Sequence, residues 1–413
     1  MTAHTSHTET QCRLCKSEDI GVFLDLGETP LSDRLVDPAK RDEAEPIFPL
    51  KVAFCSDCSL VQITETVDPN VLFADKYPYY SSFLPALLAH SKKNVLARIE
   101  DRKLNKDSLV IELASNDGYL LKNYVEAGIP VLGIDPADGP PAVAEEIGVP
   151  TLNEFFTKDL ADKLASDGKI ADVIHANNVL AHVADTNGFV AGIKQILKPN
   201  GVAVIEAPYL KPLIEHVEFD TIYHEHLCYF SVTALDHLFK RHGLYLNHVE
   251  QLSIHGGSLR LFVEPFEAPK ESVLGLLRNE RDIGMDKPEY FQDFAARVNK
   301  LKSSLVTMVR DLKEDKYTVA AYGAAAKGAT MLNFCGLTDE DIDFVVDRNT
   351  HKQGQLMPGA HLPILAPEAL VELKPDYVVI LAWNFADEIL EQQADYRELG
   401  GKFIVPVPSP RVI

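Results

Sequence analysis

Short apolar runs alternate with amphipathic stretches along most of the chain after residue 107. Runs of roughly four to eight apolar residues are typical of strands buried on both faces, and the amphipathic stretches between them are typical of helices. The first series of runs covers residues 108–113, 131–135, 171–178 and 202–207, with a weaker one at 149–152. Strands that alternate with helices predict an α/β domain around a parallel sheet.

The alternation pauses after this first series and then restarts. A helical pattern at 233–242 and two apolar β segments, 245–249 and 259–263, close the first unit. Residues 270–316 are charged and helix-prone, which predicts a helical connector. Further apolar runs cover 318–323, 342–347, 376–383 and 402–407. The chain should therefore contain a second, smaller α/β unit.

Residues 1–75 differ from the rest, with several turn signals and two Cys-x-x-Cys pairs. A segment this small lacks a large hydrophobic core, so a cross-link such as a bound metal or a disulfide would stabilise it. Cys12 with Cys15, and Cys55 with Cys58, can each place two thiolates on one tetrahedral ion; together they complete a closed site, which predicts structural zinc. Residues 16–54 separate the pairs, a longer gap than in compact zinc ribbons, so a redox pair stays an alternative.

Charge and composition narrow the classes of function. The formal net charge of −21 repels phosphate backbones and argues against nucleic acid or an anionic membrane as the main partner. No apolar run approaches the roughly 20 residues of a membrane helix, and the N-terminus lacks the apolar core of a signal peptide. We therefore expect a cytoplasmic protein. In that reducing compartment, paired Cys-x-x-Cys motifs favour metal over disulfides.

The first strand ends in a loop of small and polar residues that opens a helix. Small residues let a ligand approach the backbone, and Asp135 ends the second strand, where a carboxylate can bind two ribose hydroxyls. The loop has one glycine and lacks the GxGxxG spacing for a pyrophosphate, which favours S-adenosylmethionine (SAM) over NAD. An ordinary strand–helix turn is the alternative. The candidate cofactor contacts are Glu112, Ser115, Asn116, Gly118, Asp135, Pro136, Asn177 and Asn178.

A cluster of titratable side chains, Tyr223-His224-Glu225-His226, follows the strand at 202–207. Histidine titrates near neutral pH and can remove a proton that must leave before a methyl group arrives. His182 lies just beyond the fourth strand, at the edge where ligands bind in such sheets. These residues predict acid–base chemistry beside the cofactor, with a plain surface loop as the alternative.

From Cys12 to the C-terminus the chain resembles the bacterial sugar C-methyltransferases, whose best-known member is the dTDP-sugar C-3′-methyltransferase of tetronitrose biosynthesis. The shared motifs occur in the same order and cover nearly the whole chain. They are the two cysteine pairs, Tyr79-Tyr80-Ser81-Ser82, Glu112 to Gly118, Tyr223 to His226, Ser253 to Ser258, Gly323 to Gly328, and Trp383-Asn384-Phe385.

The resemblance implies an α/β protein with a zinc-binding module (1–75), a Rossmann-like SAM methyltransferase domain (76–269), and a helical connector with a C-terminal Rossmann-like domain (270–413). A nucleotide sugar would lie between the last two domains. In this family a histidine and tyrosines do the acid–base work, which by position implies His226, Tyr223 and one tyrosine of the 77–80 cluster. We take Tyr79 as that tyrosine, although the sequence does not decide between it, Tyr77 and Tyr80.

C-methylation of a sugar explains why such side chains are needed. A sugar carbon becomes nucleophilic once it loses a proton beside a ketone, so the substrate should carry a ketone and react through an enolate. A neutral His226 would act as the base, and the Tyr223 hydroxyl would stabilise the oxyanion. Glu225 would hold a sugar hydroxyl or orient a histidine, and His182 is a further acid–base candidate.

Candidate substrate contacts occur in several separate segments. Lys327 lies in a glycine-lined turn before a helix, a plausible phosphate site, with a solvent-facing lysine as the alternative. His255 lies in a turn that either lines the substrate site or only connects two strands. The expected substrate contacts are Tyr77, Tyr80, His224, His255, Lys327 and Asn384.

We therefore expect a SAM-dependent C-methyltransferase that acts at C-3′ of a nucleotide-linked 4-keto-deoxysugar, with dTDP as the nucleotide, one structural zinc per chain, and a monomeric state still to be tested. O- or N-methylation of a related nucleotide sugar is the enzymatic alternative. The other classes are an NAD-dependent sugar oxidoreductase and a non-catalytic zinc-containing binding protein. The spacing of Gly323 to Gly328 does not suit a pyrophosphate loop, which argues against the oxidoreductase.

Overall fold

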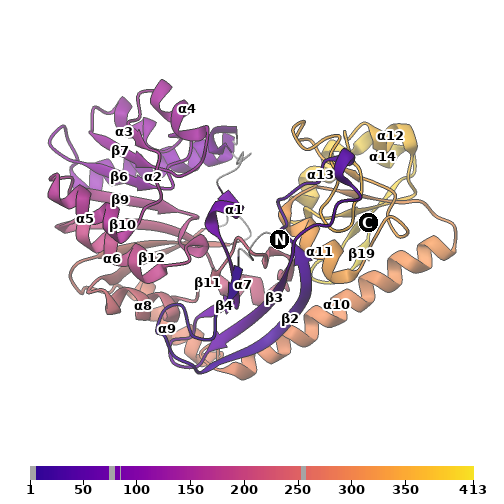
Figure 1. Cartoon of the computed structure of the whole chain (residues 1–413), viewed down its shortest axis with the longest axis horizontal. Helices are drawn as coiled ribbons and strands as arrows, with labels where there is room; N and C mark the ends of the chain where they lie inside the picture. The colour runs from indigo at the N-terminus through magenta and orange to yellow at the C-terminus, as the bar shows by residue number, and fades with distance from the viewer. Residues whose placement is uncertain (1–5, 74–79, 84, 253–256) are drawn as a thin grey trace.

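The computed structural model describes residues 6–73, 80–83, 85–252 and 257–413. Within these ranges the strands form sheets of two, four, six and seven strands. The seven- and six-stranded sheets form two lobes, and the four-stranded sheet is drawn below and between them (Figure 1). The predicted fold class, an N-terminal module followed by two α/β domains, is confirmed. The residue boundaries between these parts stay a prediction.

The four-stranded antiparallel sheet joins the N-terminal module to the central part of the chain. Its strands, in order, are β11 (Cys228–Tyr229), β4 (Val61–Ile63), β3 (Ile47–Cys55) and β2 (Ile20–Pro30). β11 begins two residues after His226 and pairs with β4. The module is therefore hydrogen-bonded to the segment that carries the candidate base.

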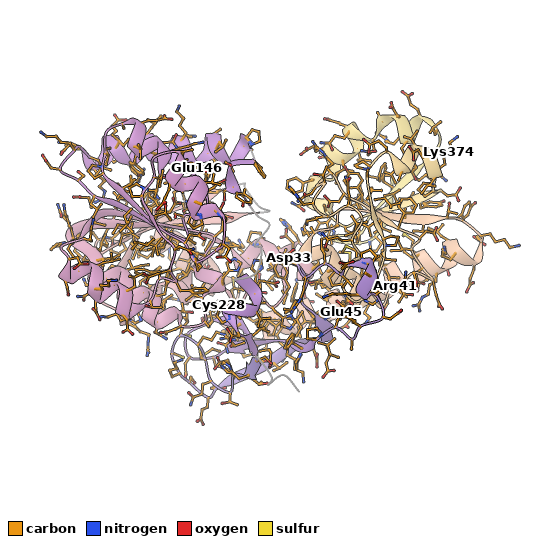
Figure 2. The ribbon with its side chains drawn as sticks, turned by 45° about the horizontal axis from the view of Figure 1, so that its top comes forward. Asp33, Arg41, Glu45, Glu146, Cys228 and Lys374 are labelled. Carbon is orange, nitrogen blue, oxygen red and sulfur yellow. The ribbon has the colours of Figure 1, made fainter. Side chains whose placement is uncertain are left out.

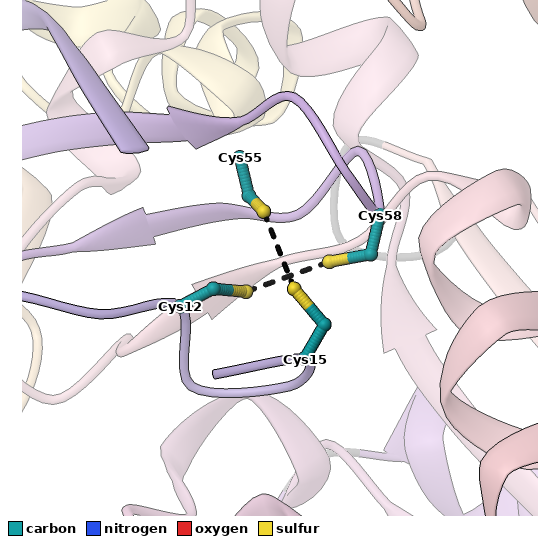
Figure 3. Close-up of side chains that lie close together, drawn as sticks. All are labelled: Cys12, Cys15, Cys55 and Cys58. Atoms are coloured by element: carbon teal, nitrogen blue, oxygen red, sulfur yellow. Dashed lines mark hydrogen bonds between the residues drawn. The ribbon is translucent and has the colours of Figure 1, made fainter. Parts of the chain in front are cut away.

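The four cysteines of the two pairs converge beside this sheet (Figure 3). The sulfurs of Cys12 and Cys58 lie 3.4 Å apart, and those of Cys15 and Cys55 lie 3.5 Å apart. All four sulfurs lie within 4.8 Å of one another. Zn–S bonds of about 2.3 Å require neighbouring sulfurs to be roughly 3.8 Å apart in a tetrahedron, so the cluster fits a closed Cys₄ zinc site.

Both cysteine pairs are built as the same turn. The amide of Lys16 donates to the carbonyl of Cys12, and the amide of Ser59 donates to the carbonyl of Cys55, each at 2.9 Å. Lys16 and Ser59 both adopt left-handed backbone angles, with φ of 63° and 60°. The two matching turns direct their four sulfurs toward one point.

The central sheet has a strand order that places its first strand in the middle. The order is β12 (Tyr245–Leu252), β13 (Ser258–Glu264), β10 (Leu197–Pro208), β9 (Ala171–Asn177), β6 (Val110–Leu113), β7 (Val131–Ile134) and β8 (Thr151–Leu152). β10, β9, β6, β7 and β8 are parallel. The strand order reverses between β6 and β9, and ligands of such sheets bind at the carboxyl ends of the strands at that point.

The central sheet differs in two places from the predicted parallel sheet. β13 runs antiparallel to both β10 and β12. The β12–β13 connection is only a few residues long, and such a short connection can join antiparallel strands but not parallel ones. β10 also begins at Leu197 and not at the predicted residue 202, and its pairing with β9 has a register irregularity between Leu197 and Val202.

The C-terminal sheet repeats this layout on a smaller scale. Its order is β16 (Ile364–Leu365), β15 (Val345–Val346), β14 (Val319–Tyr322), β17 (Tyr377–Ile380), β18 (Lys402–Val405) and β19 (Arg411–Val412). β19 is antiparallel to β18, and the other strands are parallel. This 3-2-1-4-5-6 order is that of nucleotide-binding α/β folds, and it places the switch point between β14 and β17.

One long helix, α10 (Pro288–Glu314), connects the parts. Its buried residues recur every three or four positions, as an amphipathic helix requires, and are Phe291, Phe294, Val298, Leu301, Leu305 and Val309. The ring of Phe291 lies 5.1 Å from that of Phe23 and 4.7 Å from that of Phe54, both in the N-terminal module. The helix then runs along the base of the C-terminal lobe (Figure 1).

The remaining elements cover the sheets or connect them, and one large cluster of buried apolar residues runs through all parts of the chain. No helix in the described ranges is both long and apolar enough to span a membrane. The remaining strands and α-helices are β1 (Ser6–Thr8), β5 (Glu65–Val67), α1 (Pro69–Phe73), α2 (Pro85–Arg102), α3 (Lys122–Glu126), α4 (Pro140–Glu146), α5 (Lys158–Ser166), α6 (Thr186–Ile196), α7 (Leu210–Glu215), α8 (Val232–Arg241), α9 (Glu271–Asp282), α11 (Ala326–Cys335), α12 (Ala369–Leu373), α13 (Ala386–Gln392) and α14 (Ala394–Glu398).

We predict that the purified protein carries one zinc ion per chain and that Cys55→Ser loses it. The variant should also melt at a lower temperature, because the free energy of zinc binding contributes to the folding of a small module. Metal analysis and thermal denaturation measure the two effects. Cys335→Ser, which changes a buried cysteine outside the cluster, is the control that should keep its zinc. Full metal content and an unchanged melting temperature in Cys55→Ser would contradict the zinc assignment.

Candidate functional site

The loop after β6 folds tightly over the carboxyl edge of the central sheet. Ala114, Asn116 and Gly118 have φ angles of 57°, 49° and 75°. A Cβ at Gly118 would lie 3.1 Å from the side chain of Val149, so the left-handed backbone and the close packing both require glycine there. The loop therefore stays close to the sheet and holds its polar atoms at the ligand-binding edge.

Asp135, the residue after β7, holds this loop in place. Its Oδ2 accepts the N–H of Asn116 at 2.8 Å, and its Oδ1 accepts the N–H of Ala137 at 2.9 Å. Burial raises the pKa of Asp135, and the two N–H bonds oppose that rise. Each carboxylate oxygen has two lone pairs, so Asp135 can hold the loop and still accept ribose hydroxyls.

Several buried polar atoms at this edge have no hydrogen-bond partner among the described residues. They are both carboxyl oxygens of Glu112, Ser115 Oγ, Asp117 Oδ1 and Asn177 Oδ1. Buried polar atoms are normally paired, so a group of unpaired acceptors indicates a ligand that brings donors. SAM brings an ammonium group and ribose hydroxyls and therefore fits this set. Pro136 and Asn178 are half-buried at the ends of the same strands.

The cofactor loop has acidic surroundings. Burial, followed by the carboxylates of Asp135, Asp117 and Glu206, raises the pKa of Glu112 well above its ordinary value. The same carboxylates would stabilise a cationic sulfonium and repel a pyrophosphate. The electrostatics of the loop thus favour SAM over NAD, in agreement with the sequence-based expectation.

The segment that follows the tyrosine cluster lies on the cofactor loop. The N–H of Ser81 donates to Asn116 Oδ1 at 2.8 Å, and the N–H of Ser82 donates to Asp117 Oδ2 at 3.0 Å. The hydroxyl oxygen of Tyr80 lies 2.7 Å from the point where a Cβ of Gly139 would stand. Tyr77, Tyr79 and His255 lie outside the described residues, and their expected roles stay predictions.

His226 lies beside this edge of the sheet. Its ring centroid is 4.8 Å from that of His182, shortly after β9, and 4.2 Å from that of Tyr223. Its Nδ1–H donates to the carbonyl of Thr221 at 2.8 Å, which places the lone pair of the neutral ring on Nε2. Burial, and then the nearby His182, lowers the pKa of His226 to about 3. The ring is therefore a neutral, oriented base near pH 7.

His182 is held on two sides by backbone groups. Its Nδ1–H donates to the carbonyl of Glu225 at 2.7 Å, and the backbone of Asn178 also hydrogen-bonds the ring. Burial lowers its pKa, so it too is neutral near pH 7. A ring fixed in this way is better suited to orienting His226 than to transferring a proton. The acid–base role expected for His182 stays a prediction.

Glu225 is buried, and its Oε2 has no partner in the described part of the chain. Burial, and then the carboxylate of Asp33, raises its pKa to about 8, although backbone N–H groups of Glu225 and Asp33 oppose the rise. Asp33 belongs to the N-terminal module and lies at the junction between the lobes (Figure 2). Glu225 is therefore protonated at neutral pH and can donate a hydrogen bond.

His224 contacts the N-terminal module. It is fully buried, its Nε2 lies 3.2 Å from the carbonyl of Pro49 on β3, and its ring lies 5.7 Å from that of Phe48. These contacts anchor the loop on the N-terminal module. The position favours this anchoring role over the expected contact with substrate, which stays a prediction.

Lys327 and Asn384 come together at the switch point of the C-terminal sheet. Lys327 Nζ lies 3.0 Å from Asn384 Oδ1 and 3.9 Å from the ring centroid of Trp383. The indole N–H of Trp383 donates to Asp220 Oδ2 at 2.7 Å. The two expected substrate contacts are thus linked through Trp383 to the turn that precedes Tyr223.

Two further groups of residues were not predicted from the sequence. Glu206 accepts from Arg260 Nε at 2.8 Å, and its two carboxyl oxygens each lie 3.0 Å from His90 Nε2, at the end of β10. Asp347, just after β15, accepts the N–H of Ala324 at 2.7 Å, as Asp135 accepts that of Asn116 in the central domain. In both cases the sequence has a carboxylate within or directly after an apolar run, and this pattern could have marked the residue as a candidate at the ligand edge of the sheet.

Comparisons with known proteins follow the same division of the chain. Family models described as "Putative zinc binding domain", "Methyltransferase domain" and "C-methyltransferase C-terminal domain" match residues 12–73, 80–249 and 253–408. The C-methyltransferase NovU of Streptomyces niveus is 36% identical over 406 residues, which cover 98% of this chain and 96% of NovU. A ubiquinone biosynthesis O-methyltransferase of Azorhizobium caulinodans is 29% identical over 100 residues, which cover 23% of this chain and 38% of that protein.

Among solved structures, the magnesium protoporphyrin IX methyltransferase from Synechocystis PCC 6803 with bound SAM covers 43% of this chain and 81% of its own. The sequence identity there is 12% and the TM-score is 0.33. The expected cofactors, SAM and structural zinc, agree with the matched methyltransferase and zinc-binding domains and with the cysteine cluster. The chain is a SAM-dependent methyltransferase and belongs to the C-methyltransferase family that includes NovU.

Proposed function

We propose that the protein methylates the C-3′ carbon next to the ketone of a nucleotide-linked 4-keto-deoxysugar, through an enolate. The observation that carries this proposal is the placement of His226, a neutral imidazole oriented by Thr221 at the cofactor edge of the sheet. A base alone would also serve O- or N-methylation. Two hydrogen-bond donors, Tyr223 and the protonated Glu225, share the loop with that base, and an enolate oxyanion needs such donors.

SAM supplies an electrophilic methyl group when it is bound. Asp135 would hold its ribose, and the unpartnered acceptors of Glu112, Ser115 and Asn177 would accept its remaining donors. The buried carboxylates around this loop lower the free energy of a bound cation relative to a neutral or anionic ligand. These residues bind and orient the cofactor, and the acid–base residues of the 223–226 segment act on the sugar.

His226 Nε2 would take the proton from the carbon beside the ketone; the electrons of that C–H bond would form the C=C bond of the enolate, and the π electrons of the carbonyl would move onto its oxygen. The imidazolium that forms keeps its Nδ1–H bond to the carbonyl of Thr221, which stabilises the positive charge. Tyr223 and Glu225 would donate to the oxyanion. The enolate carbon would form a bond to the methyl carbon as the methyl–sulfur bond breaks and its electron pair stays on sulfur, and His226 would later release the proton to solvent.

The C-terminal domain supports a nucleotide sugar as substrate. Lys327 lies at the N-terminus of α11 and at the switch point of the sheet, a position that favours phosphate oxygens. A second lysine, Lys352, donates to the carbonyl of Ala324 in the same loop at 2.6 Å. Two lysines therefore lie at this loop together with Asp347, whereas carboxylates surround the cofactor loop, so a diphosphate suits the C-terminal loop better than it suits the cofactor loop.

We predict that His226→Ala abolishes proton exchange at the sugar carbon but keeps ligand binding. The enzyme is incubated in D₂O with the keto sugar nucleotide and a non-reactive SAM analogue, and deuterium at the α-carbon is followed by mass spectrometry. Loss of one acid–base group should slow exchange about 10²–10⁴-fold. His237→Ala, at an exposed histidine of α8, is the matched control. Exchange at the wild-type rate in His226→Ala would show that another residue is the base.

We predict that Asp135→Ala weakens SAM binding about tenfold or more and leaves nucleotide affinity unchanged, because charge-assisted hydrogen bonds to ribose are lost. Asp347→Ala removes the matching carboxylate of the C-terminal domain and should leave SAM affinity unchanged. Calorimetric titration of both variants with SAM and with thymidine diphosphate separates the effects. Unchanged SAM affinity in Asp135→Ala would refute the cofactor assignment.

We predict that turnover falls as the pH rises through about 8, because Glu225 then loses the proton with which it donates. No loss is expected near pH 6.5 from His226, since its pKa is about 3 and the ring stays neutral there. Glu225→Gln keeps a donor that does not titrate and should remove the alkaline limb of the kcat profile. An alkaline limb that persists in Glu225→Gln would show that Glu225 is not the donor.

A further inference from the structure

Asp220 is a fully buried carboxylate in the 3₁₀ turn Phe219–Thr221, outside the proposed cofactor site. One oxygen accepts the indole N–H of Trp383, and Oδ1 has no partner among the residues described. Burial raises its pKa, and Lys327 and the Trp383 hydrogen bond oppose that rise. A buried carboxylate with a single side-chain partner is costly, which points to a role beyond packing.

The turn that contains Asp220 also orients the base. The carbonyl of Thr221, the next residue, accepts the Nδ1–H of His226 at 2.8 Å. On its other side the turn contacts α11, where Thr330 Oγ1 donates to the carbonyl of Ile222 at 3.4 Å. The rings of Phe219 and Phe334 lie 5.2 Å apart. A shift of this turn would therefore move the acceptor that sets the tautomer and direction of His226.

Trp383, the hydrogen-bond partner of Asp220, also contacts Lys327. The ammonium group of Lys327 lies 3.9 Å from the indole ring centroid, close enough for a cation–π interaction, and also bonds Asn384. A phosphate that bound Lys327 would change the charge next to the indole. It would also change the charge that lowers the pKa of Asp220.

We propose that the Trp383–Asp220 hydrogen bond couples occupancy of the nucleotide site to the position of His226. The inference rests on the proposed function, in which Lys327 binds the phosphates of the nucleotide sugar. Asp220 and Trp383 are positioning residues, since they act on the base through the backbone of Thr221. The ligand whose binding would shift His226 is a nucleoside diphosphate.

The first test uses Trp383 itself, because it is the sole tryptophan of the chain. Thymidine diphosphate is titrated without SAM or sugar, and the indole emission is recorded. Wild-type protein should show a saturable change. Lys327→Met should weaken the apparent affinity about tenfold or more through loss of a charged partner. Lys300→Met, at an exposed lysine of α10, should behave as wild type.

The second test separates binding from turnover. Trp383→Phe keeps an aromatic ring and removes the N–H donor, and Asp220→Asn keeps an oxygen that can accept. Trp383→Phe should bind thymidine diphosphate within about threefold of wild type by calorimetry, with KM unchanged, whereas kcat should fall about tenfold. Asp220→Asn should lose less kcat than Trp383→Phe. The double variant should lose no more than Trp383→Phe alone, because both changes break one interaction.

Two results overturn the coupling and leave the proposed function standing. In the first, calorimetry shows that thymidine diphosphate binds, but the emission of Trp383 does not change. In the second, the Trp383→Phe protein is folded and its kcat for methyl transfer equals that of wild type. A wild-type protein that does not bind thymidine diphosphate at all overturns the nucleotide assignment of the proposed function and the coupling with it.

Discussion

The hydrogen bonds that hold residues 219–229 connect the candidate base to every other part of the molecule. β11 pairs with β4 of the N-terminal module, and the N–H of Leu227 donates to the carbonyl of Ala181 beside β9 at 2.8 Å. Trp383 and Thr330 hold the same segment from the C-terminal domain. A short segment has no core of its own, so its external partners determine its conformation. The zinc cluster, which holds the module together, therefore contributes to the position of His226 without contacting a ligand.

The two α/β domains share the 3-2-1-4-5 order of their parallel strands and differ in the charge at their ligand edges. Each ends its second strand with an aspartate that accepts an N–H from the loop after its first strand, Asp135 in one and Asp347 in the other. Buried carboxylates surround the first loop, whereas Lys327 and Lys352 lie at the second. One backbone layout thus serves a cationic cofactor in one domain and suits a phosphate ligand in the other. The candidate base His226 lies on a segment that contacts both domains.

Features that depend on short stretches of sequence were predictable, and features that depend on distant contacts were not. The apolar runs located most strands of both sheets, and the spacing of Cys12, Cys15, Cys55 and Cys58 predicted a cluster that the structure contains. The two-residue strand β11 could not be predicted, because its pairing with β4 is set by a strand far away in the sequence. For the same reason no pattern indicated that His224 would turn toward Pro49, or that Asp220 would meet Trp383.

The dependence of residues 219–229, which carry the candidate base, on the zinc-containing module can be measured by hydrogen–deuterium exchange. Zinc-loaded protein and protein treated with a chelator are compared, and amide protection is followed peptide by peptide. Residues 219–229 should lose protection together with residues 12–63 when zinc is removed, while residues 108–135 of the cofactor edge keep theirs. Full protection of residues 219–229 in zinc-free protein, with the module itself exchanging freely, would contradict the account.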